Sequence, residues 1–392
     1  MSEQTSINKR SIGWMGLQRG HKARPLEWLA EQVIFLVSLS AIVMVFLIFI
    51  FVAREALPIF LGEMNSASIQ KVIPMEDMDK LTPAQLEAYL GLTPKQFAEM
   101  DQDTRKTLME IKIEDARDSS KDKDAAINTA SWRYMLLPYQ WTGYSKPVYI
   151  WQPVSQIQKY NVVPLLIGSL KATLVALLFS VPLALGAAIY VSQLTTPRLR
   201  EFLKPAIEML AGIPSVVLGF FALIVMATVL QKVFGYQSRL NAFVAGIALG
   251  LAIIPVVFSI AEDALTSVPR SYTQAALALG SSKWQAAWSI VLPAAIPGVF
   301  AAVVLGFGRA IGETMIVLMA SGNASIVSWD LFDSTRTMTA TIAAELAETV
   351  FGGQHYRILF MLGVFLFVMT FFSNMAAELV INRLKHKLEG KR

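Results

Sequence analysis

Six long apolar segments dominate this sequence of 392 residues, in which 54% of the residues are hydrophobic. The first segment, Val33–Ala53, contains no charged side chain. A helix of about 20 apolar residues crosses the hydrocarbon core of a bilayer and satisfies its own backbone hydrogen bonds there. We therefore predict an all-α integral membrane protein with six transmembrane helices, at Val33–Ala53, Pro164–Val191, Ala206–Leu230, Asn241–Ala261, Pro293–Ala320 and Ile358–Ile381.

The charges outside the spans predict the orientation. Arg198, Arg200 and Lys204 lie between the second and third spans, and more basic residues gather at both ends of the chain. Basic loops stay on the cytoplasmic side, so both termini are expected there, and this explains the net charge of +5 better than nucleic-acid binding does. The expected parts are a cytoplasmic basic N-terminus (1–30), a first transmembrane helix (31–61), an external insert (62–155), a core of five further transmembrane helices (156–382) with a cytoplasmic helical segment at 270–292, and a cytoplasmic basic tail (383–392).

The external insert between the first two spans has a different composition from the rest. N-cap signals at Thr82-Pro83, Thr93-Pro94 and Asp101/Asp103 predict three short helices, the third over Arg105–Arg117. A charged linker, Ser119–Asp124, follows this third helix. The segment Trp132–Trp151 is rich in aromatic residues, which suits a membrane interface or a docking surface. We expect a mostly helical appendage.

The residues exclude several kinds of chemistry. The chain has no cysteine, and its three histidines, His21, His355 and His386, form no cluster in the sequence, so neither a metal site nor a cofactor site is predicted. No G-x-x-x-x-G-K-[ST] phosphate-binding loop occurs, and no catalytic serine–histidine or paired-carboxylate spacing is present. The chain is therefore not expected to be an enzyme, and any ATP hydrolysis would come from a partner.

The stretch Tyr272–Pro297 combines two short amphipathic helical segments with a glycine between them. Gly280 stands where a helix C-cap glycine belongs, and a second helical segment follows over Ser282–Ile290. An ordinary loop helix between spans is the simpler reading. The stretch resembles the E-A-A-x3-G-x9-I-x-L-P signature of bacterial ABC-importer permeases, with glutamine in place of the usual glutamate. The resemblance implies a coupling helix that docks on the ATPase subunit through Gln274, Ala275, Ala276, Gly280, Ile290, Leu292 and Pro293.

The second notable stretch, GFGRAIGET at 306–314, places two charges inside the fifth apolar span. Arg309 and Glu313 are four residues apart and would share one face of a continuous helix. Ionisable side chains within a span are costly and point to function by default. An ion pair that only locks helices together explains the two residues equally well.

The chain resembles the PstC-type permease of bacterial phosphate importers. The similar stretches include PLLIGSL, IEMLAGIPSVVLGFFAL, GRAIGETMIVLMASGN and TMTATIAAELAE, and they cover about 60% of the chain. The resemblance implies a type I ABC importer permease fold in a bacterial inner membrane, with Arg309, Glu313 and Thr314 in the phosphate pathway. It fails at residues 62–150, where the family usually has a much shorter loop, and at Gln193, where an acidic residue is common.

The resemblance also implies partners. These are a second, PstA-like permease, two PstB-like ATPase subunits, an external PstS-like phosphate-binding protein and the surrounding lipid. Two alternatives stay open at this point, a permease for another oxyanion such as molybdate or sulfate, and a membrane-anchored sensor or channel that uses the insert for recognition. Weaker candidate residues are Lys171, Glu208, Glu345 and Glu348, which a solvated or interfacial position would explain as well.

Overall fold

The computed structural model describes residues 25–62, 100–120, 127–155 and 157–388, together with residues 85, 86, 90, 97 and 124. The chain divides into two compact units, Met1–Phe51 and Val52–Arg392, and each is considered by itself. The first unit contains most of helix α1 (Pro25–Phe60). Most of its large apolar side chains from Leu29 to Phe51 are exposed, as expected for a helix that faces lipid.

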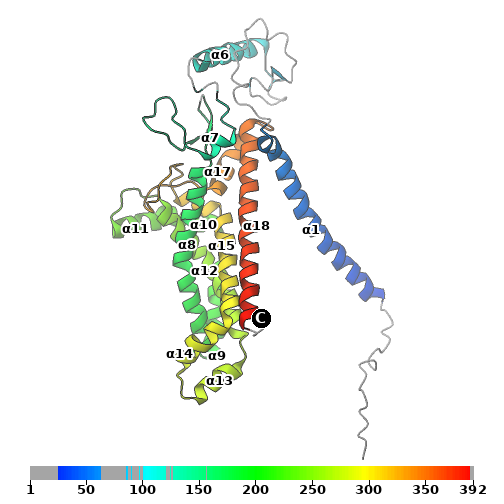
Figure 1. Cartoon of the computed structure of the whole chain (residues 1–392), viewed down its shortest axis with the longest axis vertical. Helices are drawn as coiled ribbons and strands as arrows, with labels where there is room; N and C mark the ends of the chain where they lie inside the picture. The colour runs from blue at the N-terminus through cyan, green and yellow to red at the C-terminus, as the bar shows by residue number, and fades with distance from the viewer. Residues whose placement is uncertain are drawn as a thin grey trace, which may run out of the picture. The chain divides into compact units, whose positions relative to one another are not determined.

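Four long helices form the centre of the second unit (Figure 1). Helix α12 (Ala242–Thr266) packs against α8 (Val163–Ile189) and α15 (Leu292–Gly312), and α15 also packs against α18 (Gln354–Leu388). Small residues allow the close approach, because a Cβ at Gly246 of α12 would lie 2.5 Å from the side chain of Val175. The core is therefore held by helix backbones in near contact.

The described residues contain six helical segments that are long and apolar enough to cross a membrane, which confirms the prediction of six spans. They are Leu29–Phe60, Val163–Leu194, Ser215–Phe234, Ala242–Thr266, Lys283–Gly312 and Gln354–Arg383. The third of them is composite: α10 (Ser215–Phe221) and α11 (Ala227–Phe234) are joined by a π turn, η5 (Ala222–Met226).

The third span begins later than predicted. The expected segment Ala206–Leu230 is interrupted, because helix α9 (Pro197–Glu208) ends in a 3₁₀ turn, η4 (Met209–Gly212), and α10 starts only after Pro214. Proline lacks a backbone N–H and disfavours helical geometry in the residue before it, and Ile213 is extended with ψ of 122°. Glu208 therefore ends a separate helix, outside the span Ser215–Phe234.

The fifth span is also not the single helix that Pro293–Ala320 predicted. Helix α15 ends at Gly312, Glu313 is extended with φ of −72° and ψ of 136°, and a new short helix, α16 (Met315–Ala320), follows. Apolar residues resume at Met315, directly after the break, so the average hydropathy of the segment did not reveal it.

The two ends of the second unit carry different short elements (Figure 1). One end, called the α13 end below, carries α9, α13 (Arg270–Ala278) and α14 (Lys283–Ala286), together with the π turns η3 (Tyr190–Leu194) and η6 (Ala287–Val291). The other, called the α17 end, carries α7 (Trp132–Leu136), α17 (Met338–Glu345), the 3₁₀ turn η7 (Leu346–Glu348) and the two-stranded antiparallel pair β1 (Trp151–Gln152) and β2 (Lys159–Tyr160).

Only part of the insert falls within the described residues. The predicted helix over Arg105–Arg117 is present as α6 (Gln102–Ser120), and the Asp101 carboxylate accepts a hydrogen bond from the Thr104 N–H as its cap (3.3 Å). The expected caps at Thr82-Pro83 and Thr93-Pro94 lie outside the described residues. The aromatic segment Trp132–Trp151 is held by Asp124, whose buried carboxylate accepts hydrogen bonds from the Thr142 N–H (2.6 Å) and the Tyr139 hydroxyl (3.4 Å).

Candidate functional site

Arg309 lies in the last turn of α15 and is exposed. Its neighbours Gly306 and Ala310 are buried, and a Cβ at Gly306 would come within 2.7 Å of Val257 in α12. This packing turns the opposite side of α15, with Leu305 and Arg309, away from the core. A guanidinium thus stands within an apolar span on a face that no described part of this chain covers.

Glu313 has a different surrounding from the one predicted. Because the helix breaks at Gly312, Glu313 does not continue the face of α15 that carries Arg309. Its carboxylate accepts hydrogen bonds from the backbone N–H groups of Thr314 (3.1 Å) and Met315 (3.2 Å). Its carbonyl oxygen accepts another from the Thr339 hydroxyl (2.9 Å). Among the described residues no ion pair joins Arg309 to Glu313.

The predicted pair is therefore two separate features. Glu313 holds the first turn of α16, where its negative charge also suits the positive end of the helix dipole. Thr314 is half-buried beside it, and its hydroxyl lies 3.5 Å from the Gly312 carbonyl oxygen. Arg309 is left with its charge and its fork of N–H donors open to a neighbouring subunit, water or an anion. The structure therefore contains no i,i+4 ion pair between Arg309 and Glu313.

The stretch Tyr272–Pro297 forms two short helices, as predicted. Helix α13 ends at Ala278, and Gly280 follows with φ of +89°. The Ser281 N–H donates to the Ala276 carbonyl oxygen (3.1 Å), in the pattern of a glycine C-cap. Ser282 then begins α14 with a capping box, in which its hydroxyl accepts from the Gln285 N–H (3.2 Å). The π turn η6 leads directly into α15.

This segment presents an apolar surface that no described residue covers. Leu279 is 88% exposed, and the stacked rings of Trp284 and Trp288 (5.8 Å between centroids) are 57% and 54% exposed. Of the residues predicted for coupling, Ala276 is buried, Ile290 and Leu292 are half-buried, and Gln274, Ala275, Gly280 and Pro293 are exposed. Exposed aromatic residues on a capped helix pair are typical of a docking surface. The two tryptophans were missed from sequence, although their spacing of four residues could have revealed them.

The weaker candidate residues mostly have structural contacts. The Lys171 ammonium donates to the carbonyl oxygens of Ser328 (3.1 Å) and Asp330 (2.8 Å), and so holds the loop before α17. Glu345 pairs with Arg336 (2.6 Å) and with His355 (3.1 Å). Glu348 is exposed. Gln193 donates to the Leu265 carbonyl oxygen (3.3 Å), a packing contact between η3 and α12.

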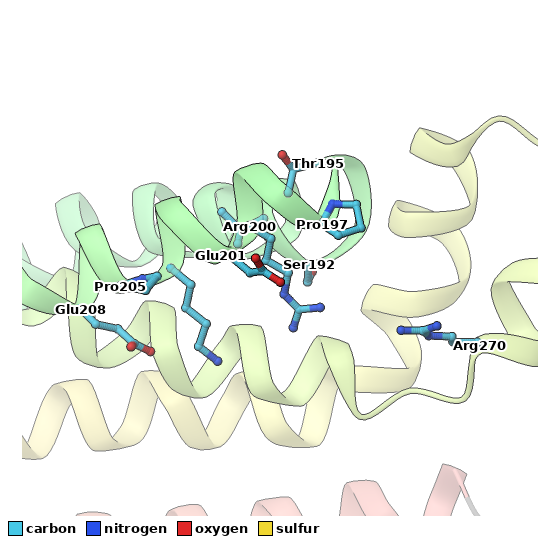
Figure 2. A pocket seen from close by; sticks show the side chains of 10 residues that line it. Ser192, Thr195, Pro197, Arg200, Glu201, Pro205, Glu208 and Arg270 are labelled. Atoms are coloured by element: carbon cyan, nitrogen blue, oxygen red, sulfur yellow. The ribbon is translucent and has the colours of Figure 1, made fainter.

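A pocket of about 820 Å³ opens at the α13 end (Figure 2). Its lining comes from η3, α9 and the first residue of α13, and consists of Val191, Ser192, Thr195, Pro197, Arg200, Glu201, Lys204, Pro205, Glu208 and Arg270. Burial opposes the charge of Lys204, but hydrogen bonds to Asp263 and Glu262 outweigh it, so the pKa of Lys204 is raised above its ordinary value. Sequence analysis predicted basic residues here but not the pocket.

The fold identifies the class of protein: a helical membrane protein with several spans and an arginine inside one of them. Residues 180–386 match the family described as "Binding-protein-dependent transport system inner membrane component". The chain is 34% identical over 236 residues to the probable ABC transporter permease protein YqgH of Bacillus subtilis. The aligned region covers 60% of this chain and 76% of that protein. It is 33% identical over 261 residues to the phosphate transport system permease protein PstC of Pasteurella multocida. That alignment covers 62% of this chain and 80% of the relative.

The chain belongs to this family of inner-membrane components of binding-protein-dependent transport systems. The resemblance to PstC-type permeases is thereby confirmed, and the protein is a multi-pass inner-membrane protein. The solved inward-facing MetNI methionine ABC transporter is also similar, with 16% identity and a TM-score of 0.43, over 57% of this chain and 94% of that one.

Proposed function

We propose that this chain is the permease subunit of an ATP-driven phosphate importer and forms one half of the translocation pathway. Relatives named as phosphate transport permeases support the substrate, at 33% identity over 80% of the relative's length. The observation that carries the proposal is the exposed guanidinium of Arg309 inside an apolar span. No relative reported above supports transport of molybdate or sulfate, and none supports a sensor or a channel.

Arg309 would compensate the charge of the anion in the pathway. Phosphate must leave water for a region of low dielectric constant, where an uncompensated charge is costly. A guanidinium offers two parallel N–H donors to two phosphate oxygens, and it is more weakly hydrated than an ammonium group. Glu313 and Thr314 would shape the path from the break between α15 and α16, where Glu313 holds the chain in place.

The exposed surface formed by Leu279, Trp284 and Trp288 would dock on an ATPase subunit. The α13 end would then be cytoplasmic, with both termini on that side, and the insert at 62–155 would be external. A PstA-like second permease would complete the pathway, two PstB-like ATPases would hydrolyse ATP, and a PstS-like binding protein would deliver phosphate. The family description, with its dependence on a binding protein, supports this assembly.

The test is phosphate uptake by the complete importer in vesicles, with sulfate and molybdate as competing anions. Arg309→Lys keeps the charge but loses the fork, and should transport poorly, whereas Arg309→Gln should abolish uptake. Arg383→Gln, which removes an exposed arginine near the end of α18, serves as the matched control and should transport normally.

A double variant separates the pathway role from a structural pair. Replacing both members of a buried ion pair by neutral groups of similar shape often costs little stability. A structural pair would therefore be rescued in Arg309→Gln with Glu313→Gln. Since the two side chains do not meet here, the double variant should stay inactive at normal membrane abundance. Near-normal phosphate uptake by that variant would refute a direct role of Arg309.

A further inference from the structure

A charged cluster fastens α9 to α12 at the α13 end. The Glu262 carboxylate is fully buried (0% exposed) and forms ion pairs with Arg200 (2.5 Å) and Lys204 (2.7 Å) of α9. The Thr266 hydroxyl donates a further hydrogen bond to it (3.0 Å). We call Arg200, Lys204, Glu262 and Thr266 the Glu262 cluster. A buried carboxylate that loses such partners is strongly unfavourable, so these contacts resist separation of the two helices.

The cluster fixes position along the helices as well as distance. Arg200 and Lys204 are one turn apart on α9, and both reach the same carboxylate. One turn further along each helix, the Ser259 hydroxyl donates to the Glu208 carboxylate (2.9 Å). Three successive turns of α9 therefore contact α12, and sliding or rotation of α9 on its neighbour would break these contacts.

The two fastened helices lead to different functional parts of the chain. Three residues separate the end of α12 at Thr266 from α13, which belongs to the segment proposed to dock on the ATPase. Helix α9 continues through η4 and Pro214 into α10 and the third span. Figure 2 shows Arg270, the first residue of α13, facing α9 across the pocket. Among the described residues Arg270 makes no ion pair, and the pocket that it lines together with α9 residues lies between the two helices.

We propose that the Glu262 cluster holds α9 and α12 together as one rigid body during the transport cycle, so that movement of α13 is passed to the third span. This inference rests on the proposed function. Arg200, Lys204 and Glu262 would be positioning residues, because they do not touch the transported anion but set how far an ATPase-driven movement reaches the pathway. Loss of the cluster should therefore uncouple ATP hydrolysis from uptake.

The test uses the complete importer in vesicles and measures phosphate taken up per ATP hydrolysed. Glu262→Gln should lower this ratio by a factor on the order of ten, a typical size for coupling between sites, while ATP hydrolysis continues. Glu201→Gln is the matched control, because Glu201 is an exposed carboxylate of the same helix that makes no ion pair among the described residues. An unchanged ratio in Glu262→Gln would overturn the proposal, whether or not both rates fall with the amount of assembled complex.

A covalent link keeps the proposal testable if Glu262→Gln fails to assemble. The chain has no cysteine, so Glu208→Cys with Ser259→Cys can be joined selectively by a short bifunctional thiol reagent. The linked importer should retain its ratio of uptake to hydrolysis, and the link should restore that ratio in Glu262→Gln. If linking abolishes uptake while hydrolysis continues, α9 and α12 move apart and the proposal is wrong.

The native complex also separates this inference from the proposed function. If it takes up a different anion in place of phosphate, the proposed substrate is wrong, but the ratio of that anion to ATP still tests the Glu262 cluster.

Discussion

At the scale of single residues, Glu313 and Arg309 show how one break in a helix changes the role of a side chain. Four residues separate them, which on a continuous helix would bring them together. The break after Gly312 instead directs the Glu313 carboxylate to the N–H groups of Thr314 and Met315. A carboxylate engaged by backbone amides organises the chain, and the arginine remains free for a ligand or a partner subunit.

This role predicts that Glu313 acts as a hydrogen-bond acceptor more than as a charge. Glu313→Gln keeps an acceptor oxygen and should retain most uptake, whereas Glu313→Ala leaves the first amides of α16 without their cap. Loss of a helix cap costs about 1 kcal/mol, so Glu313→Ala should lower both thermal stability in detergent and phosphate uptake. Equal damage by Glu313→Gln and Glu313→Ala would show that the negative charge itself is required.

At the scale of elements, the contact between α8 and the loop before α17 depends on one glycine. A Cβ at Gly168 would overlap the Arg336 carbonyl oxygen and lie 2.6 Å from the Thr335 hydroxyl oxygen. The neighbouring Ser169 hydroxyl accepts a hydrogen bond from the Met338 N–H (3.0 Å), so the same part of α8 also positions the start of α17. The loop cannot retreat without losing these contacts.

Gly168→Ala should therefore destabilise the protein, by about 1–3 kcal/mol for an overpacked site. Gly186→Ala is the matched control in the same helix, because no atom lies within 4 Å of the added methyl group. Alanine is the better helix former by about 1 kcal/mol, so Gly186→Ala should be neutral or slightly stabilising. Thermal unfolding in detergent compares the two, and similar effects at both positions would contradict the close contact at Gly168.

The α13–α14 element depends on backbone conformation at Gly280. Nothing lies within 4 Å of a Cβ built there, so any cost of substitution comes from its φ of +89° and not from a clash. Gly280→Val should distort the turn and weaken ATPase association, while the chain still inserts in the membrane. Gly280→Asn is the control, since asparagine tolerates positive φ, and it should largely preserve association. Co-purification of the ATPase measures the effect, and an intact, fully active Gly280→Val complex would refute the docking assignment.

At the scale of the whole molecule, the last part of the insert is anchored in the folded α17 end. Asp124 and Ala130 are buried, and Ala130 belongs to the core cluster that includes Met135, Trp151 and Tyr160. Asp124 and Ala130 are thus part of the folded α17 end. A replacement that reaches residue 130 would therefore remove buried residues of this folded end.

We predict that replacing residues 65–120 by a short flexible linker preserves phosphate uptake. Extending the replacement to residue 130 removes Asp124, which accepts hydrogen bonds from Thr142 and Tyr139, and should reduce assembly. Uptake in vesicles, corrected for the amount of assembled complex, compares the two variants. Complete loss of uptake in a well-assembled 65–120 variant would show that the separable part is needed for transport.

The sequence by itself determined the six spans, the helix at Gln102–Ser120 and the glycine cap at Gly280, because each depends on local composition or local geometry. Hydropathy is a sum over neighbouring residues, and a cap needs only the few residues around it. The residues that resemble the PstC-type family were also visible at this level. Breaks inside apolar stretches were not, because Pro214 and Gly312 interrupt a helix without interrupting its hydropathy.

Only the tertiary structure decided which polar groups meet. No sequence pattern singled out Glu262. Its carboxylate is nevertheless fully buried against Arg200 and Lys204, which lie about 60 residues away in the chain. The spacing of Arg309 and Glu313 predicted that they share a helix face, yet their side chains form no ion pair. The partner of a charge within a span depends on helix packing and on where a helix breaks, and both are set by contacts between residues far apart in the sequence.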